Sequence, residues 1–142
     1  MVKTLDKEAK KEIVEAIRQA ERLTSGEIRV HLQSRCKEDV LTHARKVFSR
    51  LGMGRTKQKN AVLIFVALDS RRFAVLGDSG IHACVGDEFW SGTRDIMDNY
   101  FSKGRIKEGI ITGIRNIGEK LKAYFPLQTN DGNELSDTVT EG

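Results

Sequence analysis

Four side chains of this sequence carry oxygen atoms of the kind that bind hard divalent cations: Glu27, Asn60, Asp78 and Asp87. Carboxylate and amide oxygens are the ligands that Ca²⁺ and Mg²⁺ take in proteins. A cation held by such a set, with Arg55 or Lys57 beside it, would bind a phosphate group and polarise it. The four residues are far apart in the sequence, so this chemistry depends on the elements that would bring them together.

Three strands are predicted, at residues 27–33, 60–68 and 72–77. The run from Ala61 to Leu68 is apolar throughout and rich in β-branched residues, which is typical of a strand covered on both faces. In the first strand apolar and polar residues alternate, which predicts one polar face. The third strand follows a polar turn at residues 69–71, and we expect it to pair with the central strand as a hairpin.

Apolar stripes at helical spacing predict four helices, at residues 5–23, 40–51, 89–101 and 106–124. Because a helix separates the first two strands, these strands should be parallel and joined by a right-handed crossover. Gly109 and Gly113 share one face of the last helix, where we expect them to let a neighbouring element approach closely. The predicted fold class is α/β, a three-layer sandwich in which helices cover both faces of a small mixed sheet.

The direction of the strands sorts the candidate residues between two rims of the sheet. The parallel strands begin at one rim, and the third strand, running the other way, ends there. This amino-end rim should therefore gather Glu27, Asn60, Asp78 and Asp87. The opposite, carboxyl-end rim is the rival site and carries Asp69, Ser70 and Arg71, because ligands of open α/β sheets usually bind outside the carboxyl ends of parallel strands.

The length of 142 residues indicates one domain that can bury a core without disulfide or metal staples. We expect the domain to cover residues 1–125 and a disordered acidic tail to cover residues 126–142, which hold no lysine or arginine. Cys36 and Cys84 are far apart and lack the spacing of a zinc site, so we expect two free thiols.

Charge and hydropathy limit the partners and the location. The net charge is +4, but basic and acidic residues are interleaved and no aromatic-basic stripe is present, which argues against nucleic-acid binding. No apolar run approaches the roughly 20 residues needed to cross a bilayer. The first residues are charged where a secretory signal would be apolar, so we expect a cytoplasmic protein.

The three histidines are a separate group of candidate residues, because none of them belongs to the predicted set of oxygen ligands. His31 and His43 fall on the polar faces of their predicted elements, where we expect them to be solvated. His82 and Cys84 could ligate a soft metal, or they could be a turn histidine and a buried thiol. The sequence leaves these alternatives open.

Short motifs match those of a known family in order and spacing. They are Thr24-Ser25-Gly26-Glu27-Ile28, Gly52-Met53-Gly54-Arg55, Asn60-Ala61-Val62-Leu63-Ile64, Asp69 with Arg72, Gly77-Asp78-Ser79-Gly80-Ile81, Asp87, and Phe101 with Gly104, Gly109 and Gly113. On these residues the chain resembles the TPM domain family over positions 5–125.

The resemblance implies a Rossmann-like α/β sandwich, binding of divalent cations such as calcium, and the acid phosphatase activity of a plant relative. The family motifs cluster at the amino-end rim and favour it over the rival rim. The chain departs from the family at Gly80-Ile81-His82, where many members have Gly-Leu-Glu.

Two functions follow as hypotheses. The first is a cation-binding domain with low, metal-dependent acid phosphatase activity toward a phosphate-containing small molecule. The second is a module without turnover that binds a protein partner, with calcium modulating that binding. No complete set of nucleophile, base and orienting residue is visible in the sequence, which favours the second hypothesis.

Overall fold

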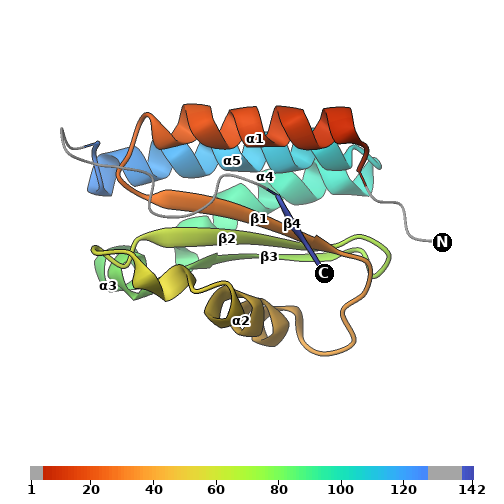
Figure 1. Ribbon diagram of the computed structural model, residues 1–142, viewed down its shortest axis with the longest axis horizontal. Coiled ribbons are helices and arrows are strands. Elements are labelled where there is room, and N and C mark those ends of the chain that lie inside the picture. Colours follow the sequence, from red (N-terminus) through yellow and green to blue (C-terminus); the bar gives the residue numbers. More distant parts are fainter. Residues whose placement is uncertain (1–4, 128–138) are drawn as a thin grey trace.

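The structure is a computed structural model that describes residues 5–127 and 139–142. Its helices and strands follow one another along the chain as α1 (Lys7–Glu21), β1 (Glu27–Gln33), α2 (Val40–Arg50), η1 (Met53–Arg55), β2 (Ala61–Ala67), β3 (Arg72–Gly77), α3 (Ser79–Val85), η2 (Asp87–Trp90), α4 (Ser91–Ser102), α5 (Ile106–Tyr124) and β4 (Thr140–Glu141). Figure 1 shows a sheet between two helical layers, with α1, α4 and α5 on one face and α2 on the other. The predicted three-layer α/β sandwich is confirmed.

The sheet is mixed and has the strand order β3-β2-β1-β4. The two central strands, β1 and β2, are parallel, and β3 returns antiparallel to β2, as the sequence predicts. The register pairs Glu27 with Ala61 and Val62 with Gly77. Both central strands therefore begin at the rim where β3 ends.

The two faces of β2 belong to different parts of the core. Val62, Ile64 and Val66 pack with the apolar side chains of α1, α4 and α5. Leu63 and Phe65 pack with those of α2 and η1. All seven residues of β2 are buried, because a side chain on either face of a strand covered on both sides is removed from water.

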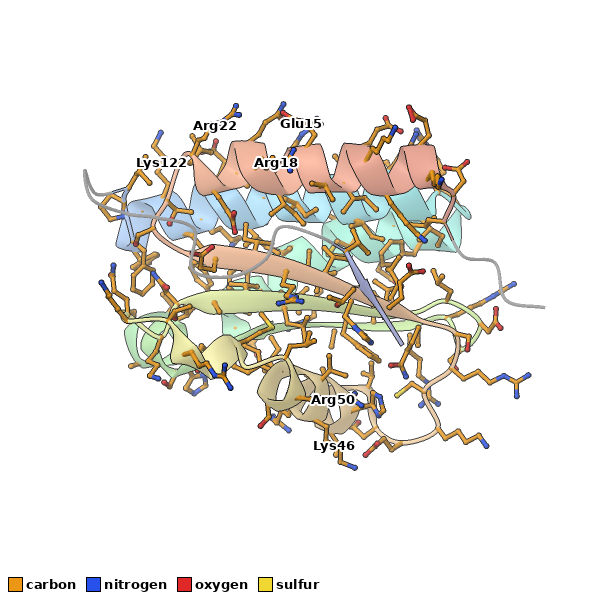
Figure 2. The ribbon with its side chains drawn as sticks, viewed as in Figure 1. Glu15, Arg18, Arg22, Lys46, Arg50 and Lys122 are labelled. Atoms are coloured by element: carbon orange, nitrogen blue, oxygen red, sulfur yellow. The ribbon has the colours of Figure 1, made fainter. Side chains whose placement is uncertain are left out.

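The outer surfaces of the helical layers are charged. In Figure 2 the side chains of Glu15 and Arg22 extend from α1 away from the sheet, and Lys46 does so from α2. Each of these helices is thus amphipathic, with an apolar stripe against the sheet and charges in water.

Three glycines of α5 bring neighbouring helices close. A methyl group on Gly109 would lie 2.5 Å from Cε1 of Phe101, and one on Gly113 would lie 2.5 Å from Sδ of Met97, both on α4. A methyl group on Gly118 would lie 2.9 Å from Cβ of Ala20 on α1. These distances are too short for a side chain, which confirms the packing role predicted for Gly109 and Gly113.

Helix α3 and strand β4 are not predicted from the sequence. The segment after Gly77, for which no helix is predicted, forms helix α3, and β4 pairs with β1 inside the region expected to be a tail. Most of that tail, residues 128–138, lies outside the described residues, so the expectation of disorder there stays a prediction. None of the helices in the described ranges is long and apolar enough to cross a membrane.

Candidate functional site

Glu27 and Asp78 lie in one row that crosses the sheet at its amino-end rim. Glu27 is the β1 partner of Ala61, and the Asp78 amide donates to the Ala61 carbonyl at 2.9 Å, which continues the β2–β3 register by one residue. Residues of one row point to the same face of a sheet, here the face covered by α2 and η1. The small Ala61 side chain separates the two carboxylates, whose Cα atoms lie about 10 Å apart at the usual strand spacing.

Asn60 is held beside this row by hydrogen bonds from three directions. Its amide donates to Thr56 Oγ1 at 3.3 Å, its carbonyl accepts from the Glu27 amide at 3.4 Å, and its Nδ2 donates to Ser25 Oγ at 3.2 Å. Asn60 is 1% exposed and Glu27 is 3% exposed, so both side chains lie inside the rim rather than on its surface. The structure therefore brings Glu27, Asn60 and Asp78 together, as the strand directions predict.

Asp78 ends β3 and caps the next helix. Its Oδ1 accepts from the Ser79 amide at 2.7 Å, which satisfies one donor at the start of α3. Its Oδ2 is buried, and within residues 5–127 and 139–142 it has no hydrogen-bond partner. A buried carboxylate oxygen without a partner costs roughly 1–3 kcal/mol or more, so a group that contacts this atom would stabilise the rim.

The remaining predicted residues lie further out. Asp87 begins η2 after α3, whose seven residues span about 10 Å, so its backbone is separated from Asp78 by the length of that helix. Arg55 and Lys57 are exposed, and the Arg55 side chain packs against Gly52. His82 and Cys84 are exposed on α3, and both cysteines are free thiols, as expected.

The donor set of the amino-end rim suits a hard cation but is incomplete as a cage. It offers two carboxylates, the Asn60 amide oxygen and neutral backbone and hydroxyl oxygens, which are Ca²⁺ or Mg²⁺ ligands. Across the described part of the chain, no group of three or more His, Cys, Asp or Glu side chains is arranged to hold a metal ion. A cation bound here would keep several water ligands.

The carboxyl-end rim is built by the turn between β2 and β3. The Leu68 and Asp69 amides donate to the carbonyls of Gln33 and Ser34, and Ser70 Oγ accepts from the Cys36 amide at 2.9 Å. Arg71 has a φ of 54°, a left-handed conformation that non-glycine residues adopt uncommonly. The turn is therefore tied to the end of β1, and Ser70 has a structural partner.

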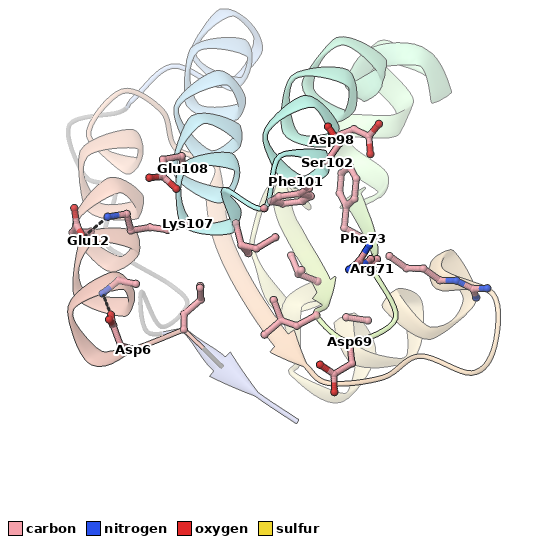
Figure 3. Close-up of a pocket in the computed structure, with 18 of the residues that line it drawn as sticks. Asp6, Glu12, Asp69, Arg71, Phe73, Asp98, Phe101, Ser102, Lys107 and Glu108 are labelled. Atoms are coloured by element: carbon pink, nitrogen blue, oxygen red, sulfur yellow. Dashed lines mark hydrogen bonds and ion pairs between the residues drawn. The ribbon is translucent and has the colours of Figure 1, made fainter. Parts of the chain in front are cut away.

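A cavity of about 1060 Å³ opens beside this turn and carries both charge signs on an apolar floor. Figure 3 shows Asp69 and Arg71 on one side of it and Glu12 and Lys107 on the other. Lys107 Nζ lies 3.1 Å from Glu12 Oε2, and this hydrogen bond and the carboxylate charge raise the pKa of Lys107. Phe73 and Phe101 cross edge to face at 4.9 Å in the cavity wall.

Most of this cavity is not predicted from the sequence. Its apolar wall residues occur within helical and strand stripes that also predict core, so nothing in their spacing marks them as cavity lining. Of the residues predicted for the carboxyl-end rim, Asp69 and Arg71 line the cavity.

The fold and its two polar rims define a small α/β sandwich with one buried acidic row and one charged cavity at opposite ends of the same sheet. The sequence model of the TPM domain family, which carries the name TPM phosphatase, matches residues 1–120 of this chain. The chain belongs to this family. The comparison with curated proteins finds no match.

Solved structures agree with this assignment. The chain is similar to the BA42 protein of the psychrophilic bacterium Bizionia argentinensis, with 44% identity, 99% of this chain and 97% of that chain covered, and a TM-score of 0.92. An N-terminal domain from P. gingivalis shares 23% identity over 85% of this chain and 78% of that one, with a TM-score of 0.70. The N-terminal domain of the cg2496 protein of Corynebacterium glutamicum shares 13% identity over 94% of this chain and 80% of that one, with a TM-score of 0.64. The last two show the fold alone.

Proposed function

We propose that this domain binds one divalent cation, Ca²⁺ or Mg²⁺, at the amino-end rim through Glu27, Asn60 and Asp78, with Asp87 as a predicted fourth ligand. The observation that carries the proposal is the Oδ2 atom of Asp78, which is buried without a partner among the described residues and lies in the same row as the buried Glu27. A cation at this rim would satisfy this oxygen and offset the cost of burying it.

The affinity should be modest. Two carboxylates supply little ligand charge, and sites of this kind bind calcium in the range of about 0.1–1 mM. Arg55 and Lys57 lie on the neighbouring loop, from which they could contact an anion that follows the cation. Binding of a phosphate group is therefore the second step of the proposal and depends on the first.

Turnover would depend on an activated nucleophile at this rim. The hydroxyls of the rim are engaged with carbonyls and amides: Thr24 Oγ1 donates to the Phe125 carbonyl, and Ser25 Oγ accepts from Gln58 and Asn60. Neither has a base as its partner in these contacts. Phosphatase activity would thus use water on the cation as its nucleophile, at a low rate.

A second candidate function rests on the cavity at the carboxyl-end rim. Its apolar floor and its charges of both signs suit a peptide segment of a protein partner. Because the same sheet joins both rims, a cation at one end could modulate binding at the other. This candidate involves no chemistry on the ligand.

Calorimetric titration of CaCl₂ and MgCl₂ into chelator-treated protein tests the first proposal. We expect one cation per chain, with binding lost in Glu27→Gln and Asp78→Asn and kept in the matched control Asp69→Asn at the opposite rim. Binding that survives in both amino-end variants would overturn the proposal. So would the absence of binding at a cation concentration 10-fold above the weakest dissociation constant expected, about 1 mM. Aryl phosphate hydrolysis that persists in these variants would place any activity elsewhere.

A further inference from the structure

Two histidines that are distant in the sequence, His31 and His43, each contact the side chain of Gln33 through the ring nitrogen Nε2. His31, on β1, has its Nε2 3.2 Å from Gln33 Oε1, and His43, on α2, has its Nε2 3.1 Å from Gln33 Nε2. The two imidazole nitrogens therefore contact neighbouring atoms of one amide group. His31 is 5% exposed, which corrects the expectation that it is solvated.

The opposite nitrogen of each ring is already fixed. His43 Nδ1 lies 2.8 Å from Glu38 Oε2, and His31 Nδ1 lies 2.9 Å from Thr140 Oγ1. Both rings also contact Phe65, with the His31 ring stacked at 5.9 Å and 9° and the His43 ring tilted at 5.4 Å. Histidines that bind metals are oriented in this way, by a carboxylate or another polar group on the far nitrogen.

From this geometry we propose that His31 Nε2 and His43 Nε2 form a binding site for a divalent transition metal such as Zn²⁺, with the Gln33 amide oxygen as a third contact. Imidazole nitrogens suit zinc, copper and nickel, whereas calcium and magnesium take oxygen ligands. The described residues hold no third His, Cys, Asp or Glu at this place, so water completes the coordination. This site differs from the amino-end rim in position and in the metal it takes.

A metal can bind Nε2 of each histidine only if that nitrogen carries no proton. Gln33 Nε2 donates to the Arg35 carbonyl at 2.7 Å, so it also donates to His43 Nε2, whose lone pair is directed at the amide. Gln33 Oε1 accepts from His31 Nε2, and that proton must leave before the metal binds. It moves through solvent to His31 Nδ1, which then donates to Thr140 Oγ1, while the Thr140 hydroxyl donates to the Val30 carbonyl at 3.3 Å. His31 stays neutral and no net proton is released.

The electrostatic surroundings support a neutral ligand. Burial lowers the pKa of His31 despite its hydrogen bond with Gln33, and the charges of Arg50, His43 and Arg29 lower it further. Neutral imidazole is the form that binds metals. Glu38, which also accepts from Lys46 at 2.8 Å, places a carboxylate behind His43 and strengthens that nitrogen as a ligand.

Zinc titration followed by calorimetry and by long-range ¹H–¹⁵N imidazole spectra tests the site. The chain has three histidines, so His82→Ala is a matched control, and Cys84→Ser removes the exposed thiol as a competing ligand. In the Cys84→Ser background, Zn²⁺ should shift the Nε2 signals of His31 and His43 and leave those of His82 in place. His43→Ala and Glu38→Gln should each weaken binding by about 10-fold or more.

Two further measurements separate this site from the cation site proposed above. Excess CaCl₂ should not displace zinc, and Gln33→Glu should tighten zinc binding because it puts an anionic oxygen where the amide oxygen lies. Zinc affinity that is unchanged in His43→Ala, binding that disappears with Cys84, or shifts confined to His82 would each overturn the proposal. The spectra of the Cys84→Ser protein decide the question even if a His31 variant fails to fold.

Discussion

Glu27 and Asp78 flank Ala61 in a single row of the sheet, on the face that α2 and η1 cover. The chain reaches this arrangement because β2 is parallel to β1 and β3 returns antiparallel to β2. Two carboxylates that are distant in the sequence thereby lie at the same rim, one buried and the other with a buried oxygen that has no partner in the described ranges.

Two substitutions of Asp78 should separate the contribution of its helix cap from that of its charge. Asp78→Ala removes the cap of α3 and should lower the free energy of unfolding by about 1 kcal/mol in the presence of chelator. Asp78→Asn keeps a capping oxygen and should cost much less, since asparagine and aspartate cap helices about equally well. Urea denaturation with EDTA measures both; equal destabilisation by the two variants would mean that the carboxylate charge, rather than the cap, stabilises the fold.

Gly80 holds α3 against the loop before β2. Its amide donates to the Lys59 carbonyl at 2.8 Å, and a methyl group at this position would lie 2.1 Å from the Gln58 carbonyl oxygen. Backbone cannot move away cheaply, so Gly80→Ala should destabilise the protein by about 2 kcal/mol or more. Gly92→Ala, with nothing within 4 Å of the added methyl, should be neutral or slightly stabilising. Similar unfolding free energies for the two variants would contradict the close approach.

His31 should make stability depend on pH. Burial is the main cause that lowers its pKa in the folded protein; the groups that face it are Arg29 and Gln33 on β1, His43 and Arg50 on α2, and Thr140 on β4. In the unfolded chain its pKa is about 6.5, so the unfolded state binds more protons below this value. The stabilisation is complete above about pH 6.5 and is lost as the pH falls through the pKa of the folded state.

Thermal unfolding of the wild type and of His31→Asn between pH 7 and pH 5 measures this contribution. The wild type should lose more stability than the variant over this interval, because the variant has no ring to protonate. Parallel curves for the two proteins would show that His31 titrates in the folded state as it does in the unfolded chain.

Arg29 carries a buried donor that costs stability. Its Nε is buried without a hydrogen-bond partner among the residues described, and burial lowers the pKa of its guanidinium. Arg29→Met keeps the length of the side chain and removes the donor, so the free energy of unfolding should stay level or rise, by up to about 1 kcal/mol. The exposed Arg45→Met on α2 is the control and should change stability by less than about 0.5 kcal/mol. A clear loss of stability in Arg29→Met alone would reveal a partner for this arginine in solution.

Much of the fold follows from local pattern. The apolar run of β2 and the helical stripes predict the central strand and four of the helices, and the order strand-helix-strand predicts that β1 and β2 are parallel. Helix α3 is not predicted because Asp78 and Gly80 are residue types that favour turns, and only the folded chain shows that Asp78 caps a helix there.

The sites are predicted less completely, for a physical reason. Strand direction is enough to gather Glu27, Asn60 and Asp78, because register places whole strands at once. The burial of His31 depends on α2 covering one face of β1 and on β4 pairing along the edge of β1. The carboxyl-end cavity depends on how α1, α4 and α5 pack around the β2–β3 turn. Such relations arise from tertiary packing, which the alternation of residues in a strand does not encode.

The most direct test of the central claim is amide chemical-shift mapping during titration of chelator-treated protein with CaCl₂ and then with MgCl₂. Binding between Glu27 and Asp78 should shift the amides of residues 25–28, 58–61 and 77–80, which form the amino-end rim. Shifts confined to residues 34–36 and 69–72 would instead place the cation at the carboxyl-end rim and contradict the site proposed here.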